Sequence, residues 1–331
     1  MLNVGLLGAG RIGAVHANAI QSHPDSTLIA VSDVVSDNAQ KLATQYHCDM
    51  RNTDDIINDP AINAVLIATS TDTHADLIEA ATAAGKAVFC EKPVDLSLSR
   101  ARACLDATAD KAARIMLGFN RRFDPSFAAL QRAVKAGEIG KPELLSITSF
   151  DPAPPPVAYV KVSGGLFRDM MIHDFDMANF VMGDLPESIT AVGSSLVDPA
   201  IGEAGDVDTA VATLRYADGR IAVIQNSRRA SYGYDQRLEI LGSQGQLQVK
   251  NVAENTLVKS TADGIQSANP LHFFLERYMP AYHAEWTAFV TSVSNGTDAP
   301  VNLNDGVNAL ILAEAATQSV QSGLPSSVAS I

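Results

Sequence analysis

Long apolar runs and positive charge are both scarce in this 331-residue sequence. No stretch approaches the roughly 18 to 20 consecutive apolar residues that span a bilayer, so we expect no membrane segment. The 37 Asp and Glu residues outnumber the 24 Lys and Arg residues, and the formal net charge is -13. Such a surface repels nucleic acid and anionic membranes, so neither is an expected partner. A phosphorylated cofactor stays possible, because a helix N-terminus holds phosphate locally.

Cysteine is scarce as well. Cys48, Cys90 and Cys104 are odd in number and lack the spacing of metal ligands, so we expect reduced structural thiols and no metal site. The first residues show no basic region, apolar core or small-residue cleavage site of a signal peptide. Together these features predict a cytoplasmic protein.

The first 120 residues alternate between short apolar runs and helical stretches. The runs that read as buried strands cover residues 3–7, 27–32, 64–69, 86–90 and 114–118. Helical stretches between them cover residues 12–22, 36–46, 73–84 and 97–109. This repetition predicts parallel strands with right-handed crossovers, which is the doubly wound α/β sheet of a Rossmann domain.

A different pattern follows, so we divide the chain into domains 1–122 and 123–331. Helices are expected over residues 125–136, 166–182, 281–294 and 305–322, with a Pro-rich loop after residue 150. Strands are expected over residues 143–150, 188–197, 209–216, 220–227, 236–241 and 246–251, several of them joined by tight turns. The second domain is therefore predicted to be α+β, with a large, mostly antiparallel sheet.

Apolar residues recur along the strands of this second sheet. We expect an apolar sheet face that pairs with another subunit, although a face covered by loops is an alternative. The residues concerned are Val211, Leu214, Ile221, Val223, Leu238 and Ile240. The prediction is a homo-oligomer.

A glycine-rich loop follows the first predicted strand and opens the first helix. Gly8 permits a tight turn, Gly10 lets the backbone approach a pyrophosphate, and Gly13 allows close packing of helix and strand. Arg11 and Ile12 lie at the positive helix end, where the pyrophosphate would bind. A plain glycine-rich turn is the alternative, and the strand and helix around this loop favour a dinucleotide site.

Asp33 ends the second predicted strand, 20 residues after Gly13. Its carboxylate can accept hydrogen bonds from the adenosine ribose, whereas a 2′-phosphate would meet like charge. Val34 and Val35 offer no arginine to hold that phosphate. The expected cofactor is therefore NAD rather than NADP.

Two further groups carry candidate chemistry. Glu91 and Lys92 end the strand at residues 86–90, at the sheet edge where ligands gather, and Lys92 could stabilise an alkoxide. Asp169, His173 and Asp176 are spaced to lie along one helix face, where a carboxylate could orient an imidazole that acts as a base. Taken alone, the lysine could be a surface charge and the helix a solvated acidic stripe.

These features together resemble the Gfo/Idh/MocA oxidoreductase family over essentially the whole chain, and within it the inositol 2-dehydrogenases. The motifs that carry the resemblance are the glycine loop, Glu91-Lys92-Pro93, the segment Gly118-Phe119-Asn120-Arg121-Arg122-Phe123, the prolines after Asp151, the stretch from Lys161 to Asp176, and Tyr232-Gly233-Tyr234-Asp235-Gln236.

The resemblance implies roles for individual residues. Lys92, Asp169 and His173 would form the catalytic set. The implied polyol contacts are Lys92, Asn120, Asp151, Asp169, His173, Asp176 and Tyr234. Thr69, Ser70 and His74 would lie around the nicotinamide half of NAD, with Val34, Glu91 and Lys92 also in the cofactor site. A tetramer is implied as well.

The implied reaction is NAD-dependent oxidation of a polyol hydroxyl, above all of myo-inositol to 2-keto-myo-inositol (scyllo-inosose). The sequence departs from some inositol dehydrogenases, because Asp151 stands where they carry asparagine and a nearby histidine has no counterpart. The substrate could therefore also be a different inositol stereoisomer or an aldose. The sequence is compatible, too, with an NADP-linked sugar reductase, with a glycosidase that uses NAD transiently, and with an NAD-sensing regulator without catalytic activity.

Overall fold

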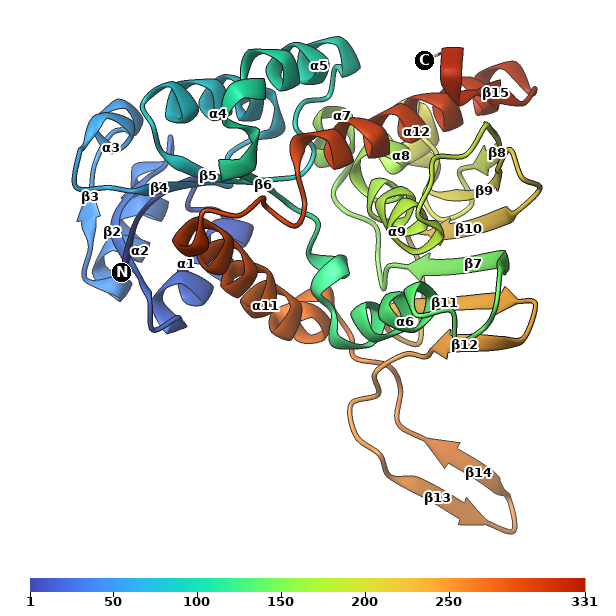
Figure 1. The fold of residues 1–331 in the computed structure, drawn as a ribbon. Helices are drawn as coiled ribbons and strands as arrows, with labels where there is room; N and C mark the ends of the chain where they lie inside the picture. Colours follow the sequence, from blue (N-terminus) through green and yellow to red (C-terminus); the bar gives the residue numbers. More distant parts are fainter. Residues whose placement is uncertain (331) are drawn as a thin grey trace. The chain divides into compact units, whose positions relative to one another are not determined.

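A sheet of six parallel strands forms the centre of the first of two compact units in the computed structural model (Figure 1). Its strands are β1 (Leu2–Leu7), β2 (Ser26–Ser32), β3 (Asp49–Met50), β4 (Ala64–Ile67), β5 (Ala87–Glu91) and β6 (Ile115–Gly118). They lie in the order β3-β2-β1-β4-β5-β6, so the order reverses between β1 and β4. Ligands of doubly wound sheets bind beyond the carboxyl ends of the strands at this reversal. The predicted Rossmann sheet is confirmed.

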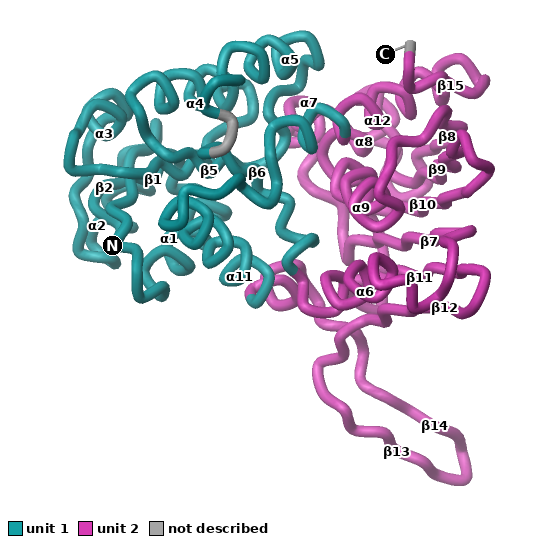
Figure 2. The backbone as a smooth tube through the Cα atoms, viewed as in Figure 1, with its two compact units in different colours: residues 1–123, 280–308 teal, residues 124–279, 309–331 magenta. Residues whose placement is uncertain are grey.

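The structure describes residues 1–330, and for residues 112, 113 and 330 the backbone alone. The first compact unit holds residues 1–123 together with 280–308, and the second holds residues 124–279 and the chain from 309 onward (Figure 2). The sequence suggested one boundary between residues 122 and 123. In the structure, a later segment of the chain returns to the first unit.

Helices cover both faces of the first sheet. They are α1 (Arg11–Ser22), α2 (Ser36–Tyr46), α3 (Thr53–Asn58), α4 (His74–Ala83), α5 (Leu98–Ala107) and, from residue 280, α11 (Phe274–Asn295). Figure 1 shows α4 and α5 on one side of the sheet and α1 with α11 on the other. The fully buried ring of Phe89 on β5 contacts Trp286 and Phe289 of α11 edge-on. These aromatic contacts account for the return of α11 to this unit.

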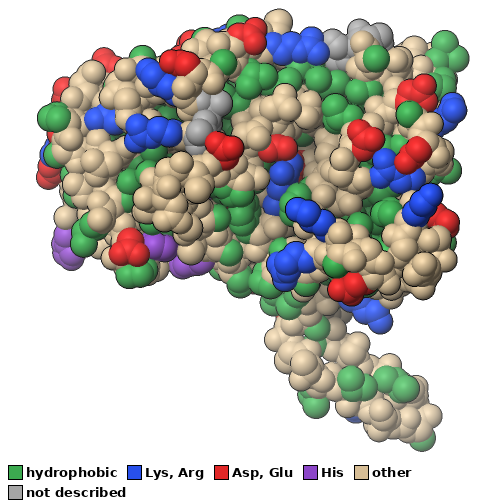
Figure 3. Space-filling view, viewed as in Figure 1, with side chains coloured by type: hydrophobic (Ala, Val, Ile, Leu, Met, Phe, Trp, Pro, Cys, Tyr) green, Lys and Arg blue, Asp and Glu red, His purple; other side chains and the backbone are tan. Residues whose placement is uncertain are grey.

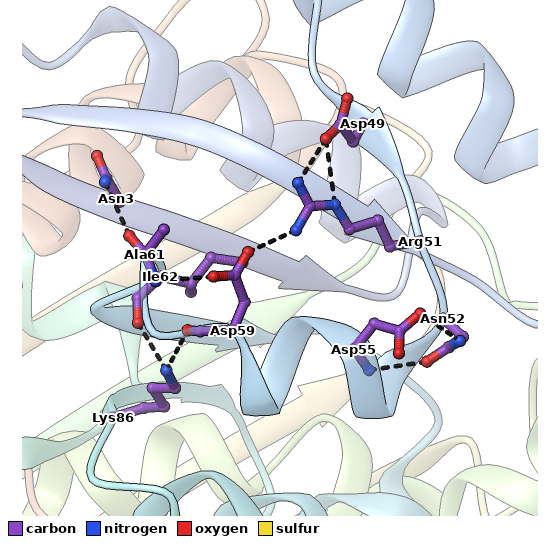
Figure 4. A network of polar contacts seen from close by, with 9 residues as sticks. All are labelled: Asn3, Asp49, Arg51, Asn52, Asp55, Asp59, Ala61, Ile62 and Lys86. Carbon is purple, nitrogen blue, oxygen red and sulfur yellow. Dashed lines mark hydrogen bonds and ion pairs between the residues drawn. The ribbon is translucent and has the colours of Figure 1, made fainter.

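A network of polar contacts connects residues of the segment between β3 and β5 (Figure 4). Arg51 forms ion pairs of 2.5 Å with both Asp49 and Asp59. The buried ammonium of Lys86 donates hydrogen bonds to the backbone oxygens of Asp59 and Ile62, at 2.6 and 2.8 Å. These bonds satisfy backbone groups of the turn before β4, so the network has a structural role.

The second unit is built on a seven-stranded sheet. Its strands are β7 (Pro142–Phe150), β8 (Ser188–Ser194), β9 (Thr209–Arg215), β10 (Ile221–Ser227), β11 (Asp235–Gly242), β12 (Gly245–Val249) and β15 (Ser326–Ser327), in the order β12-β11-β7-β10-β9-β8-β15. The β7–β10 pair is parallel and the other pairs are antiparallel. The predicted, mostly antiparallel sheet is confirmed.

The remaining elements of this unit include several that the sequence did not predict. Its helices are α6 (Pro125–Lys135), α7 (Val157–Ser163), α8 (Gly165–Asp169), α9 (Ile172–Met182), α10 (Pro199–Glu203) and, from residue 309, α12 (Leu303–Ser322). A hairpin of β13 (Val258–Thr261) and β14 (Gly264–Ser267) extends from it (Figure 1). Short 3-10 helices lie at η1 (Thr71–Thr73), η2 (Ala109–Arg114) and η3 (Asn120–Phe123) in the first unit and at η4 (Val328–Ser330) in the second. Of these elements, α7, α10, the hairpin, η3 and η4 were not predicted.

The prediction that the six apolar residues share one face of the second sheet is wrong. Leu214, Leu238 and Ile240 are buried, whereas Val211 and Ile221 are 38% and 42% exposed. Successive side chains of a strand point to opposite faces, so residues an odd number apart, such as 211 and 214, cannot share one. The six apolar positions therefore divide between the core and the uncovered side of the sheet.

Candidate active site

The glycine loop has the geometry that a pyrophosphate requires. Gly8 has a φ of +96°, and a Cβ there would lie 2.3 Å from the backbone oxygen of Ala68, beside β4. A Cβ on Gly13 would lie 2.0 Å from the backbone oxygen of Gly8. A Cβ on Gly10, by contrast, would meet no atom within 4 Å. The absence of a Cβ on Gly8 and Gly13 thus allows the close backbone contacts of the loop. Gly10 leaves space for phosphate at the N-terminus of α1.

Asp33 does more in the structure than the sequence suggested. Its Oδ2 accepts a hydrogen bond from the backbone N–H of Ala9 at 2.6 Å, and its Oδ1 accepts one from Val35 at 2.7 Å. The carboxylate therefore ties the glycine loop to the end of β2. Val34 is fully exposed beside it. A carboxylate in this place suits a ribose with free hydroxyls, and its bond to Ala9 carried no sequence signal.

His74 links the loops that follow β4 and β5. Its Nδ1 lies 2.8 Å from the backbone oxygen of Pro93, and its Nε2 lies 3.2 Å from that of Thr69. Burial lowers the pKa of His74, although the two carbonyl groups oppose this shift. The imidazole is therefore neutral and donates one hydrogen bond, for which the shorter contact to Pro93 is suited. Thr69 also contacts Thr73 through its hydroxyl at 2.7 Å, next to the exposed Ser70.

The lowered pKa of His74 predicts a loss of stability in acid. Above an unfolded-state pKa of about 6.5 both states are neutral at this residue, so its contribution is fully present there. As the pH falls below that value, the unfolded chain takes up a proton that the folded chain refuses. The free energy of unfolding should then fall by up to about 1.4 kcal/mol per pH unit.

Denaturant unfolding of the wild type and of His74→Asn between pH 7 and pH 5 measures this effect. The variant should be less stable at pH 7 but should show the shallower pH dependence. Equal slopes for the two proteins would contradict the assignment.

Glu91 and Lys92 lie at the carboxyl end of β5. Glu91 Oε1 is 2.7 Å from Nε2 of His16, a fully buried residue of α1 whose ring also contacts Phe89 and Tyr282. Lys92 is partly buried, and it follows Glu91 at the sheet edge where the glycine loop also lies. Asn120 is buried in η3, directly after β6. The candidate residues of the first unit thus follow the carboxyl ends of β1, β2, β4, β5 and β6.

The prediction of a single helix over residues 166–182 is wrong, because the helix is interrupted between α8 and α9. The N–H of Met171 bonds to Leu166 five residues back, and that of His173 bonds to Met170 three residues back. In an α-helix each N–H bonds to the carbonyl oxygen four residues back, and these two bonds depart from that pattern. Asp169 therefore ends α8, while His173 and the buried Asp176 belong to α9. The three residues do not share one helix face.

Asp169 accepts hydrogen bonds from two residues that sequence reasoning missed. Tyr159 Oη of α7 lies 3.0 Å from Asp169 Oδ1, and Arg228 Nη2 lies 3.3 Å from Asp169 Oδ2. The side chain of Asp169 is 15% exposed. Tyr159 follows a Pro-rich segment and Arg228 follows β10, so neither occurs in a recognisable motif.

One end of the second sheet gathers further candidate residues. Asp151 follows β7, and its N–H bonds to the backbone oxygen of Ser227 at the end of β10. The parallel pairing of β7 and β10 brings the residues after each strand, Asp151 and Arg228, to the same end. Tyr234 precedes β11 at this end, buried edge-on against Tyr278. The second unit therefore places Asp151, Asp169 and Tyr234 at one end of its sheet.

Metal and membrane sites have no support in the described chain. Residues 1–330 contain no cluster of His, Cys, Asp and Glu that could hold a metal ion. No helix in the same part of the chain is long and apolar enough to cross a membrane.

A Rossmann sheet with this glycine loop defines the class of dinucleotide-binding proteins. Residues 2–119 match the model of an oxidoreductase family with an NAD-binding Rossmann fold, GFO/IDH/MocA. Residues 127–248 match the GFO/IDH/MocA C-terminal domain. The chain belongs to the Gfo/Idh/MocA oxidoreductase family, and its first unit is an NAD-binding domain.

Among its relatives is the inositol 2-dehydrogenase of Rhizobium meliloti (strain 1021), which is 50% identical over 317 residues and 96% of each chain. A solved myo-inositol dehydrogenase from Corynebacterium glutamicum shares 43% identity and a TM-score of 0.95, covering 99% of this chain and 98% of that one. The scyllo-inositol dehydrogenase of Lactobacillus casei, solved with NAD(H) and scyllo-inositol, shares 30% identity and a TM-score of 0.91 over 99% of each chain.

Proposed function

We propose that this chain is an NAD-dependent inositol 2-dehydrogenase that oxidises myo-inositol to 2-keto-myo-inositol (scyllo-inosose). The observation that carries the proposal is the 50% identity to an inositol 2-dehydrogenase over 96% of both chains. The open space at Gly10 and the carboxylate of Asp33 support NAD as the cofactor. Carboxylate, amide and phenol groups are suitable partners for the hydroxyls of an uncharged polyol.

In the proposed mechanism, neutral His173 accepts the proton of the reacting hydroxyl, and Asp169 stabilises the imidazolium that forms. The ammonium of Lys92 stabilises the alkoxide that develops on the same oxygen. NAD, held by the glycine loop and Asp33 of the first unit, would supply the acceptor for the hydride that leaves the substrate carbon. The expected polyol contacts are Asn120, Asp151, Asp176 and Tyr234, which orient the ring through its remaining hydroxyls.

An initial-rate panel tests the function. The purified protein is given myo-, scyllo- and chiro-inositol and glucose with NAD or NADP, and the absorbance of the reduced cofactor is followed. We expect the highest kcat/KM for myo-inositol with NAD. A higher kcat/KM with another polyol would show that myo-inositol is not the preferred substrate, while the proposed reaction would stand. No reduced cofactor from any free polyol would overturn the proposal, as a glycosidase or a regulator would then fit better.

We also propose that the protein is a homotetramer assembled through the uncovered face of the second sheet. Apolar residues on this face are exposed by 38% to 65%. They are Leu144, Val192, Val211, Ile221 and Leu241. Leu257, Val258 and Ile265 on and beside the β13–β14 hairpin are exposed by 57% to 77%, and Figure 3 shows apolar side chains along this hairpin. Apolar surface on this scale indicates an interaction site.

Light scattering at micromolar concentration should therefore return four times the chain mass of 34.9 kDa. Val211→Asp should lower that mass, because it would place a charge within the apolar face. Met50→Asp in the first unit is the matched control, since Met50 is also exposed and apolar but lies on β3. A wild-type mass near that of one chain would exclude the tetramer.

We further propose a cytoplasmic location, which the cysteines support. Cys48, Cys90 and Cys104 are free thiols. Burial raises the pKa of Cys90 well above its usual value and that of Cys104 to about 12. Such thiols stay protonated and unreactive, as expected of structural cysteines in a reducing compartment.

A further inference from the structure

Arg228 is a buried cation outside every motif of the sequence. Its side chain is 2% exposed, and its N–H donates to the backbone oxygen of Asp208 at 2.8 Å. Its guanidinium forms an ion pair with Asp169, at 3.3 Å between Nη2 and Oδ2. Within residues 1–330, no other carboxylate forms an ion pair with it. A buried guanidinium without a counter-ion is strongly unfavourable, so Arg228 depends on Asp169 as its ion-pair partner.

The donors on Asp169 come from two separate elements. Tyr159 of α7 donates to Oδ1 and Arg228, after β10, donates to Oδ2. Asp169 is the last residue of α8. Bonds to both of its oxygens fix the plane of the carboxylate. Each oxygen has two lone pairs, so a carboxylate oxygen can accept a second hydrogen bond, such as one from an imidazole.

We propose that Arg228 is a positioning residue for Asp169, holding the carboxylate correctly oriented for its action on the catalytic base. This inference rests on the proposed function, because it assigns Arg228 to the same reaction. A lysine could supply the charge but not the planar donor group that reaches Oδ2 from this position. Arg228 itself need not touch substrate or cofactor.

The adjacent residue supplies a matched control. Arg229 is exposed and donates to the backbone oxygens of Leu196 and Val197, both at 3.4 Å. Arg229→Gln therefore makes the same chemical change in the same loop without removing a donor from Asp169. Its kcat should stay within about twofold of wild type.

The experiment compares wild type, Arg228→Gln, Asp169→Asn, the double variant and Arg229→Gln in the myo-inositol assay. Arg228→Gln should lower kcat by about 10- to 100-fold, the effect of a misplaced catalytic group. The KM for NAD should stay within about twofold, because Arg228 lies in the second unit. The double variant should be no more than about twofold slower than Asp169→Asn, since Arg228 acts through that residue.

The outcomes separate this inference from the proposed function. If Asp169→Asn is slow and a folded Arg228→Gln has the kcat of wild type, the positioning role is overturned and the function stands. The positioning role would also be overturned if the kcat losses of Arg228→Gln and Asp169→Asn multiplied in the double variant. An Asp169→Asn variant with wild-type turnover would overturn the catalytic assignment itself. If Arg228→Gln does not fold, Arg228→Lys decides: a kcat at least fivefold lower with unchanged KM for NAD supports the role, and a smaller loss overturns it.

Discussion

Replacing His173 with alanine should lower kcat for myo-inositol oxidation by about 10²- to 10⁴-fold, the usual contribution of a positioned base. Binding of NAD should change little, since His173 belongs to the second unit and the glycine loop to the first. An imidazole must be neutral to accept a proton, so wild-type kcat/KM should fall as the pH drops below neutral. The variant should lose this acidic limb.

Asn179→Ala serves as the control for His173→Ala, because both residues lie on α9 and are partly buried. It should keep wild-type turnover and the wild-type pH profile. Steady-state rates with saturating NAD between pH 6 and pH 9 provide the measurement. Near-normal turnover of His173→Ala with an unchanged pH profile would make α9 a structural element and refute the mechanism.

Lys92→Ala should also have a low kcat, because the variant can no longer stabilise the alkoxide.

Combining Asp33→Ser with Val34→Arg should shift cofactor preference from NAD toward NADP. Removing the carboxylate relieves repulsion of a 2′-phosphate, and an arginine at the fully exposed position 34 can bind that phosphate. A charge-assisted hydrogen bond contributes about 1.5–3 kcal/mol, so the ratio of kcat/KM for the two cofactors should change by about 10- to 100-fold.

The bond from Ala9 to Asp33 requires a control, because Ser at position 33 also loosens the glycine loop. Asp33→Asn keeps an acceptor oxygen for Ala9 but removes the charge and the second acceptor, which Val35 uses. It should weaken discrimination against NADP while keeping more activity with NAD than the double variant. A cofactor ratio that is unchanged in the double variant would show that Asp33 does not contact the ribose.

Several particular features explain where sequence reasoning succeeded. The alternation of apolar strands and helices up to residue 118 reports burial on both faces of a parallel sheet, which depends only on local periodicity. The roles of Gly8, Gly10 and Gly13 follow from backbone sterics, and the structure shows tight contacts at two of them and open space at the third. The assignments of individual catalytic and binding residues stay predictions.

Local patterns did not reveal the features that depend on distant partners or on a subtle backbone change. The break between α8 and α9 lies within an apolar stretch that contains no proline, so periodicity alone favoured a single helix. The bonds from Ala9 to Asp33 and from Arg228 to Asp169 join residues 24 and 59 positions apart. No motif marks such partners.

The sequence by itself determined the two sheet types, the dinucleotide loop and the family, because these depend on the spacing of residues along the chain. Only the tertiary structure decided that residues 280–308 join the first unit and that a buried arginine holds Asp169. The physical reason is that both depend on packing between distant segments. Trp286 and Phe289 bury their rings against Phe89, and the parallel pairing of β7 with β10 brings Arg228 to the same end of the sheet as Asp151.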